Sequence, residues 1–163
     1  MEIKFKKVYL DSELEVCANI IRESFLTVAI ESNLTRETAP SNPAFIELED
    51  LIRMRDKGIE MFAVFEDQVQ IGFVGVEKAS EDGTYYMEKL SVLPFFRHRG
   101  YGKVMIDFIF EHVKNCGGEK IGIGIINENT VLKNWYSMYG FIETGLKKFA
   151  HLPFIVYFME KQV

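Results

Sequence analysis

The sequence has few cysteines and no long apolar run, the features typical of disulfide-rich and membrane-spanning proteins. Among 163 residues there are two cysteines, Cys17 and Cys116, which lie far apart and form no Cys-x-x-Cys pair. This usage indicates a reducing compartment and argues against structural zinc. No apolar run reaches the length of a membrane span, and the N-terminal stretch has no hydrophobic segment typical of a signal peptide. We therefore expect a cytoplasmic protein with no membrane contact.

Basic residues are also fewer than acidic ones. The chain has 19 basic and 24 acidic residues, and its formal net charge is −5. A nucleic-acid binder needs a basic surface, so this class of function is disfavoured. No internal repeat, low-complexity tract or flexible linker interrupts the chain, and 48% of the residues are hydrophobic. Residues 1–163 are therefore expected to form a single domain with a full core.

Hydrophobic patterning predicts an alternation of strands and helices. An alternating stretch predicts a strand over residues 3–10. Ser12 with Glu15 matches a capping box that would open a first helix. Asn-Pro at the start and glycine at the end predict a second helix over Pro43–Lys57.

The rest of the chain continues this pattern towards the C-terminus. The further elements expected are a hairpin over 60–79, a strand over 84–92, a helix to about 114, a strand over 120–127, a helix over 129–139 and strands over 141–149 and 154–161. The order is β-α-α-β-β-β-α-β-α-β-β. It predicts an α/β (α+β) fold with a mixed, mostly antiparallel sheet of about seven strands, flanked by four helices, with one parallel step.

A helix start rich in glycine and arginine stands out in this pattern. The stretch Arg97–Gly102 reads RHRGYG and precedes an amphipathic run. A helix N-terminus presents unpaired N–H groups and a positive dipole end, and glycines let an anion approach them closely. Arg97 and Arg99 would add charge suited to phosphate oxygens. The stretch predicts a phosphate or pyrophosphate site, although a glycine turn with solvated arginines would have the same sequence.

Two common nucleotide-binding motifs are excluded here. In a P-loop the lysine is followed by serine or threonine, but Lys103 is followed by Val104. In the dinucleotide fingerprint a third glycine stands where this chain has Met105.

Two longer segments resemble motifs of the GCN5-related N-acetyltransferases (GNAT). The segment around RHRGYG resembles motif A of that family, with matches at Leu90, Val92, Pro94, Arg97, Gly100 and Gly102. A later segment resembles motif B, with matches at Asn129, Tyr136, Gly140 and Phe141. Leu132 departs from motif B, where alanine is usual. The two motifs occur in the right order with a strand between them, and the resemblance extends over nearly the whole chain.

The resemblance implies acetyl-CoA as the co-substrate and no metal. Backbone N–H groups near RHRGYG would hold the pyrophosphate, and the preceding strand would bind the pantetheine arm. The cofactor-binding residues implied are Leu90, Ser91, Val92, Arg97, His98, Arg99, Gly100, Tyr101, Gly102, Lys103, Asn129 and Tyr136. For Asn129 a role as helix N-cap is an equally good interpretation.

The resemblance also implies a general acid. Tyr136 occupies the family's acid position, and a tyrosine hydroxyl, with a pKa near ~10, can protonate a departing thiolate. Glu88 is the candidate base because it alternates with Leu90 on the strand beside the thioester. Simple packing for Tyr136, and a solvated carboxylate or a water chain in place of Glu88, are the competing interpretations. His151, before the last strand, is a weaker candidate base.

The function expected is acetyl-CoA-dependent N-acetylation of a primary amine on a small molecule, an antibiotic-like compound or a peptide. We expect direct transfer in a ternary complex, because neither cysteine has a base or helix N-terminus near it in the sequence. The alternatives are a non-catalytic module that binds CoA or acyl-CoA, and a purely structural domain. The acceptor is not determined by any motif, and a homodimer through the apolar last strand is left open.

Overall fold

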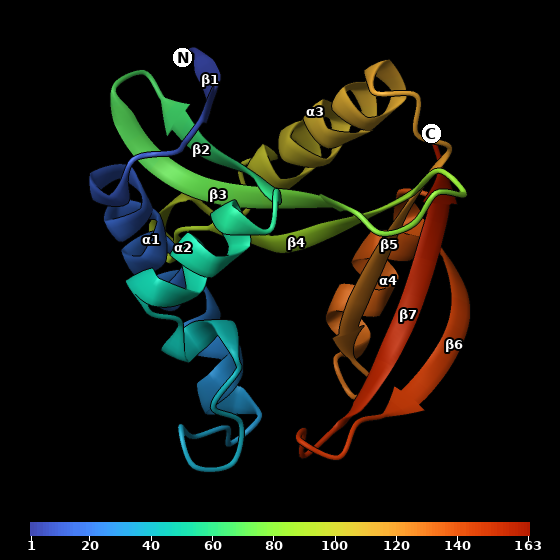
Figure 1. Cartoon of the computed structure of the whole chain (residues 1–163). Coiled ribbons are helices and arrows are strands. Elements are labelled where there is room, and N and C mark those ends of the chain that lie inside the picture. Colours follow the sequence, from blue (N-terminus) through green and yellow to red (C-terminus); the bar gives the residue numbers. More distant parts are fainter.

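The computed structural model describes all 163 residues as one seven-stranded sheet with four α-helices (Figure 1). The strands are β1 (Ile3–Lys7), β2 (Glu60–Glu66), β3 (Val69–Lys78), β4 (Thr84–Val92), β5 (Lys120–Ile126), β6 (Ile142–Lys148) and β7 (Ile155–Gln162). The helices are α1 (Asp11–Glu31), α2 (Leu48–Asp56), α3 (Tyr101–Asn115) and α4 (Thr130–Met138). The predicted order of strands and helices is confirmed.

The strands lie in the order β1-β2-β3-β4-β5-β7-β6. Every neighbouring pair is antiparallel except β4 and β5, which are parallel and are connected through α3. The expected parallel step across this helix is therefore confirmed. None of the helices combines the length and the apolarity that crossing a membrane would require.

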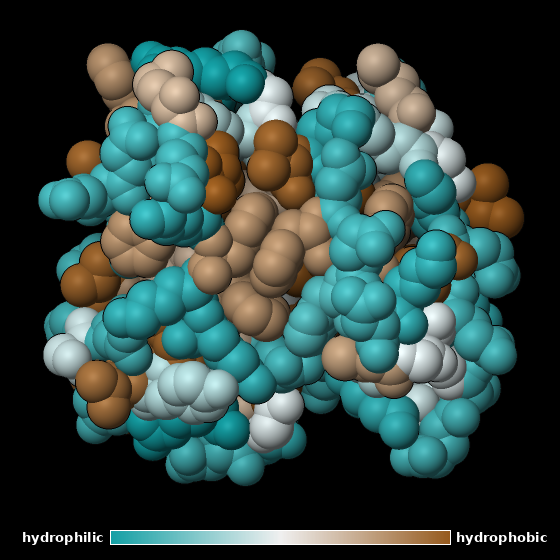
Figure 2. Space-filling view, turned by 90° about the horizontal axis from the view of Figure 1, so that it is seen from above, coloured by the Kyte–Doolittle hydropathy of each residue, from teal (hydrophilic) through white to brown (hydrophobic).

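Two hydrophobic cores lie on the two faces of the sheet. On β2, Phe62 and Val64 belong to the larger core, and Met61 and Ala63 belong to the smaller one, as the alternation of a strand requires. The larger core is shared with α3 and α4, and the smaller core with α1 and α2. Seen from above, apolar side chains gather in the middle of the molecule between hydrophilic margins (Figure 2).

The start of α1 differs from the predicted capping box. The helix begins at Asp11, and it is the Glu13 carboxylate that accepts hydrogen bonds from the N–H groups of Tyr9 (3.2 Å) and Leu10 (3.1 Å). Glu13 also forms an ion pair with Lys6 at 2.7 Å, and the lysine and these N–H groups lower the pKa of Glu13 to about 2. The predicted box from Ser12 is wrong because a residue of β1 helps to hold Glu13 at the helix start.

The predicted second helix is also wrong at its start. Residues Pro43–Phe45 form one 3-10 turn, Ile46 is extended, and α2 begins only at Leu48. Ile46 is buried in the smaller core, and its carbonyl accepts a hydrogen bond from Arg22 of α1. Packing against α1 therefore overrides the local tendency of this segment to continue as one helix.

The sheet opens between β4 and β5. These strands pair only from Thr84–Tyr86 to residues 120–122, and from there β5 pairs with β7 alone. A Cβ on Gly122 would lie 2.7 Å from the ring of Tyr86, so this ring fills the last paired position. Towards its C-terminus β4 keeps β3 as its only neighbour. The edge of β4 that faces β5 therefore leaves backbone groups without a strand partner.

Candidate active site

Six successive backbone N–H groups, those of residues 98–103, donate to no backbone or side-chain acceptor. We call these residues the open N–H cluster. They run from the end of the loop after β4 into the first turn of α3. His98 and Gly100 have positive φ angles of 62° and 83°, which turn the chain sharply there. Such a turn leading into a helix N-terminus directs N–H groups to a common side and suits an anion.

The other three α-helices begin differently. An acidic or amide side chain accepts N–H groups at each start: Glu13 at α1, Asp50 at α2 and Asn129 at α4. α3 has no side-chain cap and no acidic residue in its first turn. Because unpaired N–H groups need a partner, the open N–H cluster is suited to an acceptor from outside the chain.

The two arginines of RHRGYG have different surroundings. The Arg97 guanidinium donates to the Thr27 hydroxyl at 3.0 Å and to the Ser24 carbonyl, both on α1. Arg99 is exposed and lies over the rings of Phe95 and Phe96, at 5.0 and 5.3 Å. The charge expected from Arg97 is thus directed at α1, and Arg99 supplies the free positive charge of the loop.

The remaining predicted residues of this loop also differ in exposure. Gly102 faces α4, because a Cβ there would lie 2.9 Å from the Trp135 ring. The glycine therefore serves close packing of two helices, a reason that the sequence pattern did not reveal. The Tyr101 ring is buried next to Phe96, so only its N–H can serve a ligand. Lys103 is exposed and pairs with Asp107 at 2.6 Å.

The end of β4 carries the second part of the site. A bulge places Lys89 (φ 53°) and Leu90 where β3 supplies one residue. The buried Ser91 hydroxyl donates to the Lys89 carbonyl at 2.7 Å, which helps to hold the bulge. Leu90 and Val92 are half-buried against the larger core. The unpaired edge of β4 offers backbone groups that an extended ligand can bind as an added strand.

Tyr136 of α4 is buried, with 5% of its surface exposed. Its ring contacts Trp135 and Phe141 edge to face, with centroids 5.0 and 5.3 Å apart. No hydrogen bond to protein engages its hydroxyl, and burial raises the pKa of Tyr136. The hydroxyl therefore remains protonated at neutral pH and is free to donate.

Glu88 of β4 has the most strongly raised pKa among the carboxyl groups. Burial, the largest cause, and the neighbouring Glu77 together raise the pKa of Glu88 to about 7, against the opposing effect of Lys89, 3.6 Å away. Both protonation states are accordingly present near neutral pH. A carboxyl group with such a pKa suits proton transfer at physiological pH.

Asn129 caps α4, since its side-chain oxygen accepts the Leu132 N–H at 3.1 Å. It also lines a cleft of about 570 Å³ that extends from the end of β5 to the C-terminal half of α1 and the loop before β7. The lining residues include two carboxylates and no lysine or arginine: Val28, Glu31, Ser32, Asn33, Leu34, Thr38, Ile126, Glu128, Asn129, Thr130, Val131, Pro153 and Phe154. His151 is exposed and is not among them.

The cysteines differ from each other as well. Cys17 is buried, and burial raises the pKa of its thiol to about 11. Cys116 is exposed, and its sulfur lies 3.8 Å from His112 Nε2. The expectation that neither cysteine has a base near it in the sequence is wrong for Cys116, because four residues along a helix bring the two side chains together.

The chain is similar to known acetyltransferases in both sequence and fold. The model of the acetyltransferase (GNAT) family matches residues 21–141. Among solved structures, the PaiA N-acetyltransferase of Thermoplasma acidophilum, in complex with coenzyme A, superposes with a TM-score of 0.79 at 20% identity over 100% of both chains. A GNAT acetyltransferase of Elizabethkingia anophelis with acetyl-CoA bound gives 0.68 at 15% identity, over 99% of this chain and 98% of the other.

A third structural relative is named for a ribosomal protein that it acetylates. The ribosomal-protein-S18-alanine N-acetyltransferase of Escherichia coli gives a TM-score of 0.72 at 12% identity, over 99% of this chain and 94% of the other. Among curated proteins no sequence relative was found. Similarities of this degree establish the fold, and the family model, which spans most of the chain, establishes more: this chain belongs to the GNAT family of acetyltransferases.

Proposed function

We propose that the protein is an acetyl-CoA-dependent N-acetyltransferase that acetylates a primary amine. The observation that carries the proposal is the open N–H cluster beside the unpaired edge of β4. The first suits the pyrophosphate of coenzyme A, and the second suits the pantetheine arm, whose amides can pair with a strand edge. Two of the structural relatives contain coenzyme A or acetyl-CoA. In this family the cofactor supplies the acetyl group without a metal.

Glu88 is proposed as the base. An alkyl ammonium group has a pKa near ~10.4, so the acceptor must lose a proton before its nitrogen can attack. Glu88, with a pKa raised to about 7, can accept that proton directly or through water. The same burial that raises the pKa also limits water around the carboxylate.

Tyr136 is proposed as the acid. The amine nitrogen forms a bond to the acetyl carbon, the carbon–sulfur bond breaks, and the sulfur takes the proton of the Tyr136 hydroxyl. The nitrogen then gives up its second proton as it becomes an amide, and the tyrosinate regains a proton. Backbone N–H groups at the Leu90–Val92 edge polarise the carbonyl oxygen during this exchange. Transfer is direct, because Cys17 is buried and Cys116 lies about 22 Å along α3 from the open N–H cluster.

The acceptor is proposed to be a cationic amine. The 570 Å³ cleft is lined by the carboxylates of Glu31 and Glu128 without an opposing lysine or arginine. A molecule with a second positive charge, such as a polyamine, an aminoglycoside or a basic peptide, would be attracted by these carboxylates. An acidic or neutral amine would gain nothing from them.

The direct test is a turnover assay with acetyl-CoA and a panel of cationic and neutral amines, read by thiol release and by the mass of the acetylated product. Tyr136→Phe should lower kcat by about 10²–10³-fold and leave CoA affinity unchanged. Tyr139→Phe is the matched control, because this half-buried tyrosine also contacts Trp135 on α4. Glu128→Gln should raise the KM of a cationic amine and spare kcat.

The outcomes separate the alternatives. If acetyl-CoA raises the melting temperature but no amine is acetylated, the protein is a CoA-binding module and not an enzyme. If Tyr136→Phe turns over like the parent, Tyr136 is not the acid. If acetyl-CoA does not bind, the proposal fails as a whole.

A further inference from the structure

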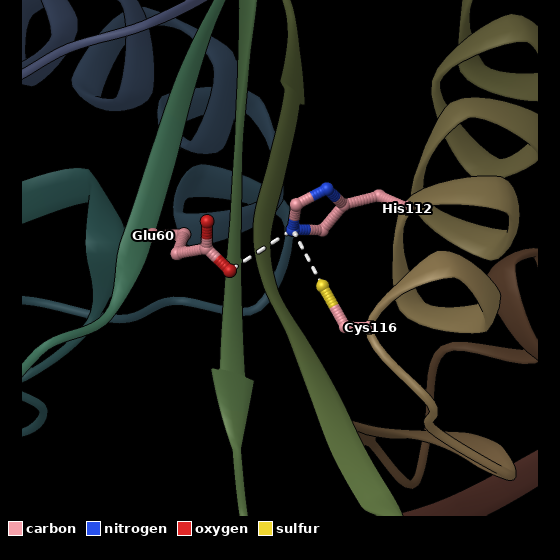
Figure 3. Close-up of side chains that lie close together, drawn as sticks. All are labelled: Glu60, His112 and Cys116. Atoms are coloured by element: carbon pink, nitrogen blue, oxygen red, sulfur yellow. Dashed lines mark hydrogen bonds and ion pairs between the residues drawn. The ribbon is translucent and has the colours of Figure 1, made fainter.

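Three chemically active side chains meet at the C-terminal end of α3, away from the open N–H cluster (Figure 3). Glu60 is the first residue of β2, His112 lies in the last turn of α3, and Cys116 follows that helix directly. His112 Nε2 lies 2.9 Å from Glu60 Oε1 and 3.8 Å from Cys116 Sγ. One ligand atom from each residue lies within 4.8 Å of the other two.

The fold explains why they meet. Strand alternation puts Glu60 on the same face as Phe62, towards α3, and the i, i+4 spacing stacks Cys116 on His112. The imidazole is held between the rings of Phe62 and Phe108, at centroid distances of 5.2 and 6.2 Å. These contacts fix the direction of Nε2 without using it.

Lys7 orients the carboxylate. Its ammonium binds Glu60 Oε2 at 2.9 Å, which leaves Oε1 directed at the imidazole. Burial opposes ionisation of Glu60, but the hydrogen bonds from His112 and Lys7 outweigh it and lower its pKa. A carboxylate fixed in this way by a neighbouring group is typical of oriented metal ligands.

The geometry distinguishes between two kinds of chemistry. In a nucleophilic triad the thiol and the carboxylate use different nitrogens of the histidine, so that the ring can relay a proton. Here Glu60 and Cys116 both approach Nε2. An oxygen, a nitrogen and a sulfur that lie within 4.8 Å of one another can instead bind one shared ion.

We propose that Glu60, His112 and Cys116 bind one Zn²⁺ ion. The set of one oxygen, one nitrogen and one sulfur is suited to zinc, and bond lengths of about 2.0 to 2.3 Å imply ligand separations of about 3.3–3.6 Å in a tetrahedron. The observed 2.9 and 3.8 Å lie on either side of that range. On binding, the thiol loses its proton and the imidazole proton moves to Nδ1, so that Nε2 offers its lone pair to the ion. Water completes the tetrahedron because Cys116 is exposed.

The ion would have no part in acetyl transfer. The cluster is separated from the start of α3 by the length of that helix, about 22 Å. Its effect is to strengthen the link between the first residue of β2 and the end of α3, which apolar contacts and the Glu60–His112 hydrogen bond already hold together. The inference therefore stands whether or not the proposed acetylation is confirmed.

The test uses the full chain, freed of metal and kept reduced with a phosphine. Titration with Co²⁺ should give a thiolate-to-cobalt absorption band that saturates at one equivalent and disappears when Zn²⁺ is added. Excess Zn²⁺ should raise the melting temperature by about 5–10 °C, because an ion that binds only the folded state stabilises it. Cys116→Ser, His112→Gln and Glu60→Gln should each abolish the band or weaken binding at least tenfold.

Two variants outside the proposed ligand set serve as matched controls. Glu111→Gln changes the exposed carboxylate next to His112 in the sequence, and His151→Gln changes an exposed histidine elsewhere, so both should bind cobalt like the parent. Should Glu60→Gln fold poorly, Cys116→Ser still decides, because that side chain is exposed. A cobalt complex without the thiolate band, or equal zinc affinity in Cys116→Ser, overturns the proposal.

Discussion

The two ends of α3 meet their surroundings in opposite ways. At the N-terminal end, residues 98–103 leave six backbone donors unpaired, and no acidic side chain stands in the first turn. At the C-terminal end, the Cys116 N–H donates to the carbonyls of the last turn, and side chains provide the polar groups. The N-terminal end thus offers backbone N–H groups to an anion, whereas the C-terminal end offers the ligand atoms of side chains to a cation. Both arrangements follow the direction of the helix dipole.

This difference shows where each kind of site can be recognised. A site made of backbone N–H groups depends on glycines, turns and the absence of a cap, so it is visible in a contiguous motif. A site made of side chains depends on what a distant strand brings to the helix. Five experiments would break or sharpen this comparison.

The largest effect on acetyl-CoA affinity is expected from Gly102→Val at the N-terminal end. The new side chain would collide with Trp135, whose ring would be 2.9 Å from the Cβ, and would push α3 away from α4. Overpacking of this kind costs about 1–3 kcal/mol. Acetyl-CoA needs the start of α3 in its parent position, so binding has to overcome this cost, and the affinity should fall about 10–100-fold. Isothermal titration calorimetry with acetyl-CoA measures this affinity. Gly145→Val is the control, because nothing lies within 4 Å of a Cβ there. Parent-like affinity in Gly102→Val would show that the helix packing does not position the donors.

A pH profile of turnover tests Glu88 of β4 as the proposed base. If Glu88 is the base, kcat/KM should fall about tenfold per pH unit below about pH 7 and level off above it, because only the carboxylate accepts a proton. Glu88→Gln should remove this dependence and most of the activity. A profile that keeps the same inflection in Glu88→Gln would assign the base elsewhere.

The raised pKa of Glu88 also makes the free energy of unfolding depend on pH. Burial raises the pKa of Glu88 from 4.5 to about 7, so the folded state binds its proton more tightly than the unfolded chain does. The stabilisation is therefore present below about pH 4.5 and is lost as pH rises to about 7. When the unfolding free energy is measured by urea titration at several pH values, Glu88→Gln should not show this decrease between about pH 4.5 and 7.

The two arginines should separate affinity from stability. Arg99→Ala removes an exposed charge beside the open N–H cluster and should weaken CoA binding about 3–10-fold, with a smaller dependence on salt. Arg97→Ala removes the hydrogen bonds to α1 and should lower the unfolding free energy by about 1–3 kcal/mol. Titration of both variants with CoA measures the affinity, and urea unfolding measures the unfolding free energy. A pure affinity loss in Arg97→Ala would mean that its guanidinium turns to the phosphates.

The smallest effect is expected for coupling between the ends. Zn²⁺ and acetyl-CoA should change each other's affinity by less than about twofold, because no two-state element connects the two ends of α3. Paired titrations of each ligand, with and without the other, measure the coupling. A reciprocal shift of tenfold or more would show that α3 transmits binding between its ends.

The sequence determined the elements and the family. Periodicity and helix-end signals located all seven strands and four helices, although the start of α2 was wrong. The RHRGYG motif with its downstream partner identified the family, because such motifs depend on residues close together in the chain. It also located the candidate acid and base, Tyr136 and Glu88, although their roles are still predictions.

Only the tertiary structure decided the rest. Capping by Glu13, the direction of Arg97 towards α1, the need for Gly102 beside Trp135 and the opening of the sheet after Tyr86 all rest on contacts between distant segments. The meeting of Glu60 with the end of α3 is of the same kind. Patterns within a segment report its own backbone preferences, whereas these features depend on which neighbour the packing of the two cores supplies.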